Sequence, residues 1–506
     1  MEDKNVSVIT RRDFIRRAAC AAVGTAAMTA SIRDLRLMNA AVAQSNITDY
    51  KALVCVFLQG GNDSNNLIIP TVPSEYSNYA AIRTPVLAIP QGVLLNLQKP
   101  GTSTGYVNPV VGDPNNYVDP AGHSFGYHPA CPELAELFYE GKLATLFNTG
   151  TLVYPITRAQ YLGGILQKPP QLFSHADQQT QWQTSIPDQP PTTGWGGRCG
   201  DLLNSVQPGA PVSLCISLAG ANTFEVGNLV TQYSVSTSGA ISLQGVSGAR
   251  LAVLTNLLGL NYSNLQVQAY AGVANHSIQS GALLNNAITN TAGNYWTNSF
   301  PAIITNNAVV GGNKFTSALA PQLQMVARLI EAGNRATTNH GFGMKRQIFF
   351  VQVGGYDLHT GQTNYSTNNP NNVLTGAHSN LFSELSQSLY AFQRAMEQLG
   401  LSQQVTAFTA SDFSRTFPSN GQGSDHGWGS HHIILGGAVK GGQTYGTLPT
   451  LAVNGPDDTG TGRWIPTTAI DQYFATLATW FGVDNSNLAT IFPNIGRFAT
   501  GNLGFI

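Results

Sequence analysis

Charged side chains are scarce in this sequence of 506 residues. Lys and Arg number 25 and Asp and Glu 26, which is 10% of the chain, and the formal net charge is -1. Binding to nucleic acid phosphates needs a basic surface, so this balance excludes a basic field that would attract DNA or RNA. No glycine-rich phosphate loop precedes a helical pattern, so nucleotide binding is not indicated either. Small polar residues and 53 glycines replace the charges, which suits an exported protein.

Cysteine is also rare, with five residues and no CxxC pair. A zinc cluster built from thiolates is therefore not expected. Cys20 lies in the expected export signal, which leaves four cysteines in the mature chain. Buried free thiols, or one disulfide formed in an oxidising compartment, are both open for these four.

No hydrophobic run is long enough to predict a permanent transmembrane helix. The Ala-rich run of residues 18–31 is short and follows residues 10–16 (TRRDFIR), which resemble a twin-arginine export signal. Small residues at 41–43 offer a cleavage site, so residues 1–43 are predicted to be a signal peptide and the mature chain to begin near Gln44. We therefore expect the twin-arginine translocase as a partner during export and a periplasmic or extracellular location.

Apolar runs of strand length alternate with helical patterns in the mature chain. The main runs cover residues 51–58, 144–148, 347–353 and 405–409, and such runs are typical of parallel strands buried on both faces. Helical spacing covers residues 132–143, 318–332, 381–399 and 470–481. The alternation predicts an α/β fold with a doubly wound, mainly parallel sheet and helices on both faces.

Residues 44–506 are predicted to form one such α/β domain. A segment at about 221–315, rich in Ser, Asn, Thr and Gln, is predicted to be a helical and loop insertion. Residues 71–130 are rich in Pro, Gly and Asn and predict a long loop.

Acids and histidines follow three of the predicted strands. In open α/β sheets, ligands bind beyond the carboxyl ends of the strands, so these side chains are candidates for one site. Asp357 and His359 lie two apart in extended chain and can therefore reach the same ion. The candidate metal ligands are Asp63 after the first strand, Asp357 and His359 after the second, and Asp412, Asp425, His426 and His431 after the third. A structural role as a helix cap remains open for Asp63.

Mixed carboxylate and imidazole ligands favour Zn, Mn or Fe, whereas a half-site rich in carboxylates could take Mg or Ca. Two divalent ions about 3.5 to 4 Å apart could orient a hydroxyl nucleophile and stabilise the leaving oxygen of a phosphate or sulfate ester. Ser174 and Thr157 compete for the nucleophile's role, and Ser174 is favoured because it starts a helical pattern where an anion could dock. Helix capping is the alternative role for Ser174.

Five segments together resemble a known family: LVCVFLQGGNDSNNLIIP, LFSHADQQTQWQTS, GGYDLHTGQ, TASDFSRT and DHGWGSHHIILGGAVKGG. With the export signal, they are similar to a group of twin-arginine-exported bacterial proteins known mainly as a domain of unknown function. That group resembles a branch of the alkaline phosphatase and sulfatase superfamily. The resemblance covers nearly the whole mature chain and implies a metal-dependent hydrolase site at the strand ends of a doubly wound α/β fold.

The resemblance implies roles for individual residues. Asp63 matches the metal acid of the first strand, Ser174 the nucleophile, and Asp357 with His359 an acid and imidazole pair. Asp412 matches the acid of a second such pair, and His426 and His431 offer the late imidazole.

The chain departs from the superfamily pattern at two places. Phe413 stands where a His usually follows the acid, and Asp425-His426-Gly427 occurs further along instead. The spacing from Asp357 to His359 is also short. A rearranged site, a single metal or an inactive site would each fit these departures. Two functions therefore stay open: a secreted metal-dependent phosphatase, phosphodiesterase or sulfatase, and a catalytically silent cell-surface binding or assembly protein on the same fold.

Overall fold

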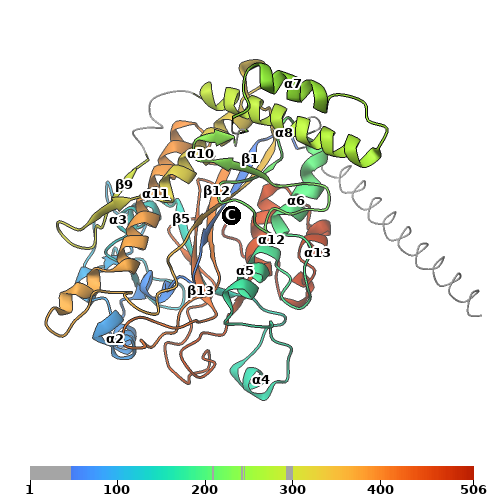
Figure 1. The fold of residues 1–506 in the computed structure, drawn as a ribbon. Coiled ribbons are helices and arrows are strands. Elements are labelled where there is room, and N and C mark those ends of the chain that lie inside the picture. The colour runs from blue at the N-terminus through green and yellow to red at the C-terminus, as the bar shows by residue number, and fades with distance from the viewer. Residues whose placement is uncertain (1–46, 208–209, 241–242, 244, 292–299) are drawn as a thin grey trace, which may run out of the picture.

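The computed structural model describes residues 47–207, 210–240, 243, 245–291 and 300–506 (Figure 1). The expected signal peptide, residues 1–43, lies outside the described residues. Within them, helices alternate with strands, and most of the strand pairs in the central sheet are parallel. The predicted α/β class with a mainly parallel sheet is confirmed.

Ten strands form the central sheet of the described structure, in the order β14-β5-β13-β12-β1-β11-β6-β7-β8, with β15 paired to β5. The long strands are β1 (Lys51–Leu58), β5 (Leu143–Gly150), β11 (Arg346–Val353), β12 (Val405–Ser411) and β13 (Ser430–Leu435). The short strands are β6 (Cys215–Ser217), β7 (Tyr233–Ser236), β8 (Gly239–Ala240), β14 (Thr444–Tyr445) and β15 (Thr468–Ala469).

Three neighbouring strands at the centre of the sheet end level with one another. β1 pairs in parallel with β11 on one side and with β12 on the other. Leu58, the last residue of β1, lies opposite Val353 and Ser411, which end the two neighbours. β13 runs antiparallel to β12 and to β5, so it begins at the edge where the other three end. Three connections, those that follow β1, β11 and β12, therefore meet at one edge of the sheet.

Two groups of helices flank the sheet, one on each side in Figure 1. On one side α3 (Pro132–Tyr139), α10 (Ala320–Asn334) and α11 (Ala377–Gln398) pack together. On the other side lie α5 (His175–Thr184), α6 (Trp195–Leu203), α12 (Ile470–Phe481) and α13 (Leu488–Ile491).

Cover on both faces explains why β1 is apolar along its length. Every residue of β1 from Ala52 to Leu58 is buried, and burying one Val or Leu side chain contributes about 1.5–3 kcal/mol. Aromatic stacking joins two of the covering helices, because Trp195 of α6 stacks on Phe474 of α12 with ring centroids 4.5 Å apart.

The segment predicted as a long loop, residues 71–130, contains regular structure, so that prediction was wrong in part. It includes α2 (Pro73–Leu87), β3 (Leu95–Asn96) and β4 (Phe125–Tyr127), and β4 joins β3 to β2 (Ile68–Pro70) in a small sheet. Pro85 lies inside α2 next to a kink at Thr84. A proline and a weak amphipathic pattern hide such a helix from periodicity.

The predicted insertion, residues 221–315, contains α7 (Ala249–Leu258), α8 (Leu265–Thr289) and β9 (Ile303–Thr305). β9 pairs with β10 (Lys314–Thr316), and α8 packs against α7, β8 and α10. In Figure 1, α7 and α8 lie beyond one end of the sheet, away from the loops after β12 and β1. The two helices of this segment therefore lie at the end of the sheet opposite these loops.

All four described cysteines are free and buried: Cys55, Cys131, Cys199 and Cys215. The free-thiol alternative therefore holds for the described part of the chain. No helix among the described residues is long and apolar enough to cross a membrane.

Asp471, in the first turn of α12, predicts a pH dependence of stability. Burial raises the pKa of this carboxyl to about 7, against about 3.9 in an unfolded chain. The unfolded state therefore loses its proton near pH 4 while the folded state keeps it until about pH 7. The contribution of this carboxyl to the free energy of unfolding is therefore fully present below pH 4 and is lost as the pH rises from 4 to 7.

Asp471→Asn removes this loss. As the pH rises from 4 to 8, the free energy of unfolding of the variant should therefore increase relative to that of wild type by roughly 2–4 kcal/mol. Urea unfolding at both pH values measures the change. Asp484→Asn, at an exposed cap, is the control and should show no such gain. Equal pH profiles for wild type and Asp471→Asn would contradict the prediction.

Candidate functional site

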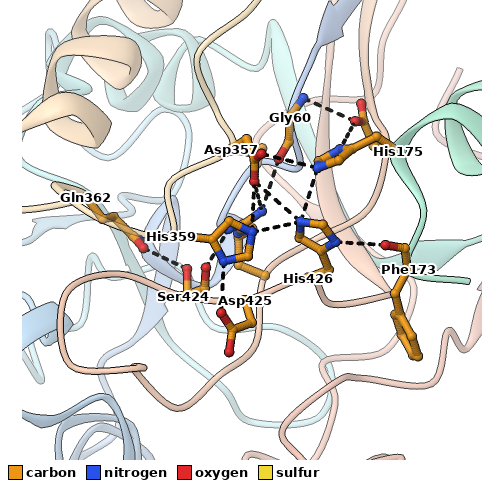
Figure 2. A network of polar contacts seen from close by, with 12 residues as sticks. Gly60, Phe173, His175, Asp357, His359, Gln362, Ser424, Asp425 and His426 are labelled. Carbon is orange, nitrogen blue, oxygen red and sulfur yellow. Dashed lines mark hydrogen bonds and ion pairs between the residues drawn. The ribbon is translucent and has the colours of Figure 1, made fainter.

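The level strand ends bring three polar connections together, and the start of a helix adds a fourth segment. Residues 59–63 follow β1, residues 354–359 follow β11, and residues 412–429 connect β12 to β13. The fourth contribution comes from α5, whose first residue is His175. Figure 2 shows that side chains from these segments point toward one another.

Gly60 permits the close approach of two of these loops. Its φ is +114°, and a Cβ at this position would lie 2.4 Å from the backbone nitrogen of Asp357. Any side chain here would both strain the backbone and push Asp357 away. The glycine pair after β1 is thus explained by the loop that lies against it.

Three imidazoles form the centre of the site. The Nε2 atom of His426 lies 3.1 Å from Nε2 of His175 and 2.9 Å from Nε2 of His359. All three rings are partly exposed, and the two outer rings come from segments far apart in the sequence. The tertiary fold alone brings these nitrogens together.

Asp357 lies beside all three imidazoles. Its carboxylate oxygens are 3.4 Å from Nε2 of His175, 3.2 Å from that of His359 and 3.4 Å from that of His426. The buried Arg415 donates from Nη1 to Oδ1 of Asp357 at 2.9 Å. Burial opposes ionisation of this acid, but the hydrogen bond and charge of Arg415 outweigh it and lower its pKa below the ordinary value. Asp357 is therefore an anion that faces three ring nitrogens.

Each imidazole has an acceptor at its other nitrogen. Nδ1 of His175 lies 2.6 Å from Oδ2 of Asp412, and Nδ1 of His359 lies 2.9 Å from Oδ1 of Asp425. Nδ1 of His426 lies 2.7 Å from the carbonyl oxygen of Phe173. Carboxylates and carbonyls can only accept, so they favour a proton on each Nδ1 and a lone pair on each Nε2. Metal-ligating histidines have this outer arrangement.

Hydrogen bonds among the three rings cannot satisfy all three converging Nε2 atoms. A neutral His426 has one lone pair on Nε2 and can accept one N–H, whereas the Nε2 atoms of His175 and His359 both lie beside it. The hydrogen bond to Asp412 raises the pKa of His175, whereas burial lowers the pKa of His426. Converging lone pairs beside a carboxylate are the donor set that a divalent cation takes. The residues present thus fit a metal ion, with ligand atoms of His175, Asp357 and His426 all within 4.8 Å of one another.

Asp412 supports this set from beneath. It is fully buried, and its Oδ2 also accepts from Nε2 of Gln179 at 3.0 Å and from the backbone nitrogen of Gly60 at 3.2 Å. His175 and Gln179 are four residues apart, so both lie on one face of α5 and reach the same carboxylate. Asp412 therefore fixes α5 against the end of β12.

An open depression of about 240 Å³ lies over these residues. Its lining is polar except for two glycines, and it consists of Gln59, Gly60, His175, Gln179, Gly355, Asp357 and Asp412. The depression gives a small polar group access to Asp357, whose side chain is 48% exposed.

Five of the residues predicted from sequence meet in this cluster: Asp357, His359, Asp412, Asp425 and His426. Three further participants were not predicted, namely His175, Gln179 and Arg415. The spacing of His175 and Gln179 was a usable indication, because the two lie on one helix face directly after Ser174. Arg415 had no such pattern in the sequence.

Asp63 lies outside the imidazole cluster. It precedes the short 3-10 helix η1 (Ser64–Asn66) and forms a buried ion pair with Arg83 of α2. Nε2 of Gln362 donates to the same oxygen at 2.5 Å. Burial opposes ionisation, yet Arg83 keeps the pKa of Asp63 below its ordinary value. Its charge is thus balanced by a guanidinium in the interior.

His431 also lies outside the cluster. Its Nδ1 accepts from the backbone nitrogen of Asn148 at 3.1 Å, and its ring packs edge-on against Phe147. Burial lowers the pKa of His431 to about 3, so the ring is neutral. These contacts join β13 to β5.

The two candidate nucleophiles differ in their contacts. Thr157 caps α4 (Arg158–Gly163) through a capping box with Gln160. Ser174 precedes His175, but its hydroxyl makes no cap hydrogen bond and instead donates to Oδ2 of Asp177 at 2.6 Å. Ser174 is thus a hydroxyl paired with a carboxylate next to the imidazole cluster.

Comparisons with known proteins add a family match. Residues 313–488 match the family described as "Protein of unknown function (DUF1501)". The predicted similarity to a domain of unknown function is thereby confirmed for that part of the chain. The matched range includes Asp357, Asp412 and His426 but not His175.

Other comparisons carry no functional information. No curated protein sequence matches the chain. One solved structure, titled "Crystal structure of Ps i-CgsB in complex with k-i-k-neocarrahexaose", aligns over 87% of this chain and 74% of its own, with 9% identity and a TM-score of 0.30. At that TM-score the likeness supports no conclusion about fold or function.

Gly60→Ala should damage the site by displacing Asp357. The added Cβ meets backbone at 2.4 Å in addition to the left-handed φ. Gly122→Ala is the matched control, because Gly122 has φ +95° and a Cβ added there would meet nothing within 4 Å. We expect Gly122→Ala to cost about 1–2 kcal/mol and Gly60→Ala at least twice as much in urea unfolding. Equal losses in the two variants would show that the loop does not depend on Gly60.

Proposed function

We propose that the protein is a secreted, metal-dependent hydrolase of phosphate or sulfate esters. The observation that carries this proposal is the meeting of His175, Asp357 and His426 at the carboxyl ends of the central strands, with ligand atoms within 4.8 Å of one another. Ligands bind at this edge in open α/β sheets. The depression beside Asp357 and His175 leaves room for an ester group.

We also propose the finer points of the family resemblance. These are an alkaline phosphatase or sulfatase-like arrangement of the sheet and export by the twin-arginine pathway. The first is supported by acids that follow β1, β11 and β12 at one edge. The second rests on residues 10–16 of the sequence.

The chain's own residues have separate tasks in this proposal. A bound divalent cation would polarise the ester and stabilise charge on its oxygens. Asp412 holds His175 in orientation through Nδ1, and Asp425 does the same for His359. Arg415 keeps Asp357 ionised. Preorganised charges of this kind cost little reorganisation during the reaction.

Ser174 is the proposed nucleophile. Its Oγ forms a bond to phosphorus or sulfur while its proton passes to Asp177, which already accepts the hydroxyl hydrogen at 2.6 Å. The bond to the leaving alcohol breaks, and the alcohol oxygen takes the proton that Asp177 received. Water then attacks the phosphorus or sulfur of the seryl ester, its proton passes through Asp177 to Oγ of Ser174, and phosphate or sulfate is released.

A catalytically silent binding or assembly protein on the same fold is the second candidate. One observation favours it: Arg415 already occupies Oδ1 of Asp357, which reduces the charge that this acid offers to an ion. Turnover distinguishes the two candidates directly.

The test uses the mature chain, loaded with Zn, Mn, Mg or Ca in turn, and a panel of aryl phosphate and aryl sulfate esters. We expect hydrolysis that a chelator abolishes and added metal restores. Ser174→Ala should lower kcat by at least about 10³-fold with metal content unchanged. Thr157→Ala, which removes another hydroxyl at a helix start, is the matched control and should keep full activity. No turnover by any metal-loaded form would overturn the hydrolase, and unchanged kcat in Ser174→Ala would overturn the nucleophile.

A further inference from the structure

We infer that the site holds one transition-metal ion, bound by His175, Asp357 and His426 with His359 beside them, and not a pair of ions. This deepens the proposed function, on which its catalytic meaning rests. Its measurement does not depend on turnover. The inference rests on ligand spacing, on the partners of the remaining carboxylates and on two buried arginines.

The three closest ligand atoms have the spacing of one coordination sphere. Tetrahedral Zn with ligand bonds of about 2.0–2.1 Å places its ligands about 3.4 Å apart. The observed separations are 3.1 Å between the Nε2 atoms of His175 and His426, 3.4 Å from His175 Nε2 to Oδ2 of Asp357 and 3.4 Å from His426 Nε2 to Oδ1 of Asp357. One ligand atom from each of the three residues can be chosen so that all lie within 4.8 Å of one another, which leaves room for one ion between them. Nε2 of His359 lies 2.9 Å from Nε2 of His426 and 3.2 Å from Oδ1 of Asp357, so it lies beside these ligand atoms.

The other carboxylates near the site bind the Nδ1 atoms of the imidazoles. Asp412 accepts from His175, Gln179 and Gly60 through Oδ2, while its buried Oδ1 has no hydrogen-bond partner among the described residues. Asp425 accepts from Nδ1 of His359 and from Nδ2 of Asn420 at 3.1 Å. Both orient ligands and do not face the converging Nε2 atoms, so the ligand set contains one carboxylate.

Buried guanidinium groups stand where a second ion would need free carboxylate oxygens. Arg415 takes Oδ1 of Asp357, and its other contacts are the carbonyl oxygens of Gly60 and Ser424. Arg83 takes Oδ2 of Asp63 and donates to two further carbonyl oxygens. A second divalent cation on either of these two oxygens would lie directly beside a guanidinium and be repelled. Oδ2 of Asp357 has no guanidinium contact within the described part of the chain and is left for one ion. Asp357 can therefore not bridge two ions, and Asp63 cannot hold one.

The donor set also selects the class of ion. Imidazole nitrogen suits first-row transition metals such as Zn and Fe, whereas Mg and Ca prefer oxygen ligands. A site with two or three imidazoles and one carboxylate therefore favours transition metals over the alkaline earths. The hydrogen-bonded acceptor at each Nδ1 adds to ligand basicity and fixes ring orientation.

The decisive experiment measures metal in the purified mature wild-type chain. Protein equilibrated with equal Zn, Mn, Fe, Mg and Ca and then gel-filtered is analysed for metal content, and X-ray absorption reports the ligands. We expect one transition-metal ion per chain with the outer-shell scattering of imidazole. Two ions per chain, no ion, or an oxygen-only ligand shell would overturn the inference.

Variants assign the ion to these residues. His175→Ala and His426→Ala should each lower metal affinity by at least 100-fold, and Asp412→Asn by about 10–100-fold. His340→Asn removes an exposed histidine from a left-handed position that Asn tolerates, so it is the control and should bind as wild type does. Circular dichroism checks that each variant is folded. Unchanged affinity in folded His175→Ala would overturn the assignment, and the wild-type spectrum decides if that variant does not fold.

This measurement separates the inference from the proposed function. One ion on imidazoles without ester turnover would sink the hydrolase and leave the metal site standing. Ester turnover by a protein with two ions would do the reverse.

Discussion

Level register among β12, β1 and β11 is the constraint on which the site depends. Leu58 lies opposite both Val353 and Ser411, so the three loops leave the sheet at the same height. A shift of one residue between two strands would displace a loop by about 3.3 Å and reverse the face of every side chain. Ligands of a metal ion must be placed to within about 0.5 Å. The long buried strands thus provide the precision that surface loops alone would not.

Balanced charge in the interior is the second condition. A buried unpaired carboxylate is costly, and the acids below the site each have a cation or a donor. Arg83 neutralises Asp63 and Arg415 neutralises one oxygen of Asp357. A chain with few charges therefore places several of them at one edge of its sheet. The polarity of this edge contrasts with the apolar strands that lead to it.

The sequence predicted the strands and the acids after them because buried parallel strands are continuous apolar runs, and β1, β11 and β12 are such runs. It did not show which acids meet. Asp63 and Asp357 both follow a glycine pair, yet their environments differ because Arg83 lies in α2, a helix hidden by Pro85 in a segment that looked like loop. His175 was passed over for its neighbour, since a residue at a helix start carries no sign of what it faces. Partners distant in sequence are set by tertiary packing, which periodicity does not record.

The reversed direction of β13 has a consequence for how this site can vary. Because β12 leaves the edge and β13 enters at it, residues 412–429 begin and end at the same edge of the sheet. This one connection supplies Asp412, Arg415, Asp425 and His426, so a candidate ligand, two orienting acids and a counter-cation lie in one contiguous segment. Replacing that segment would alter the site's chemistry while leaving the sheet intact.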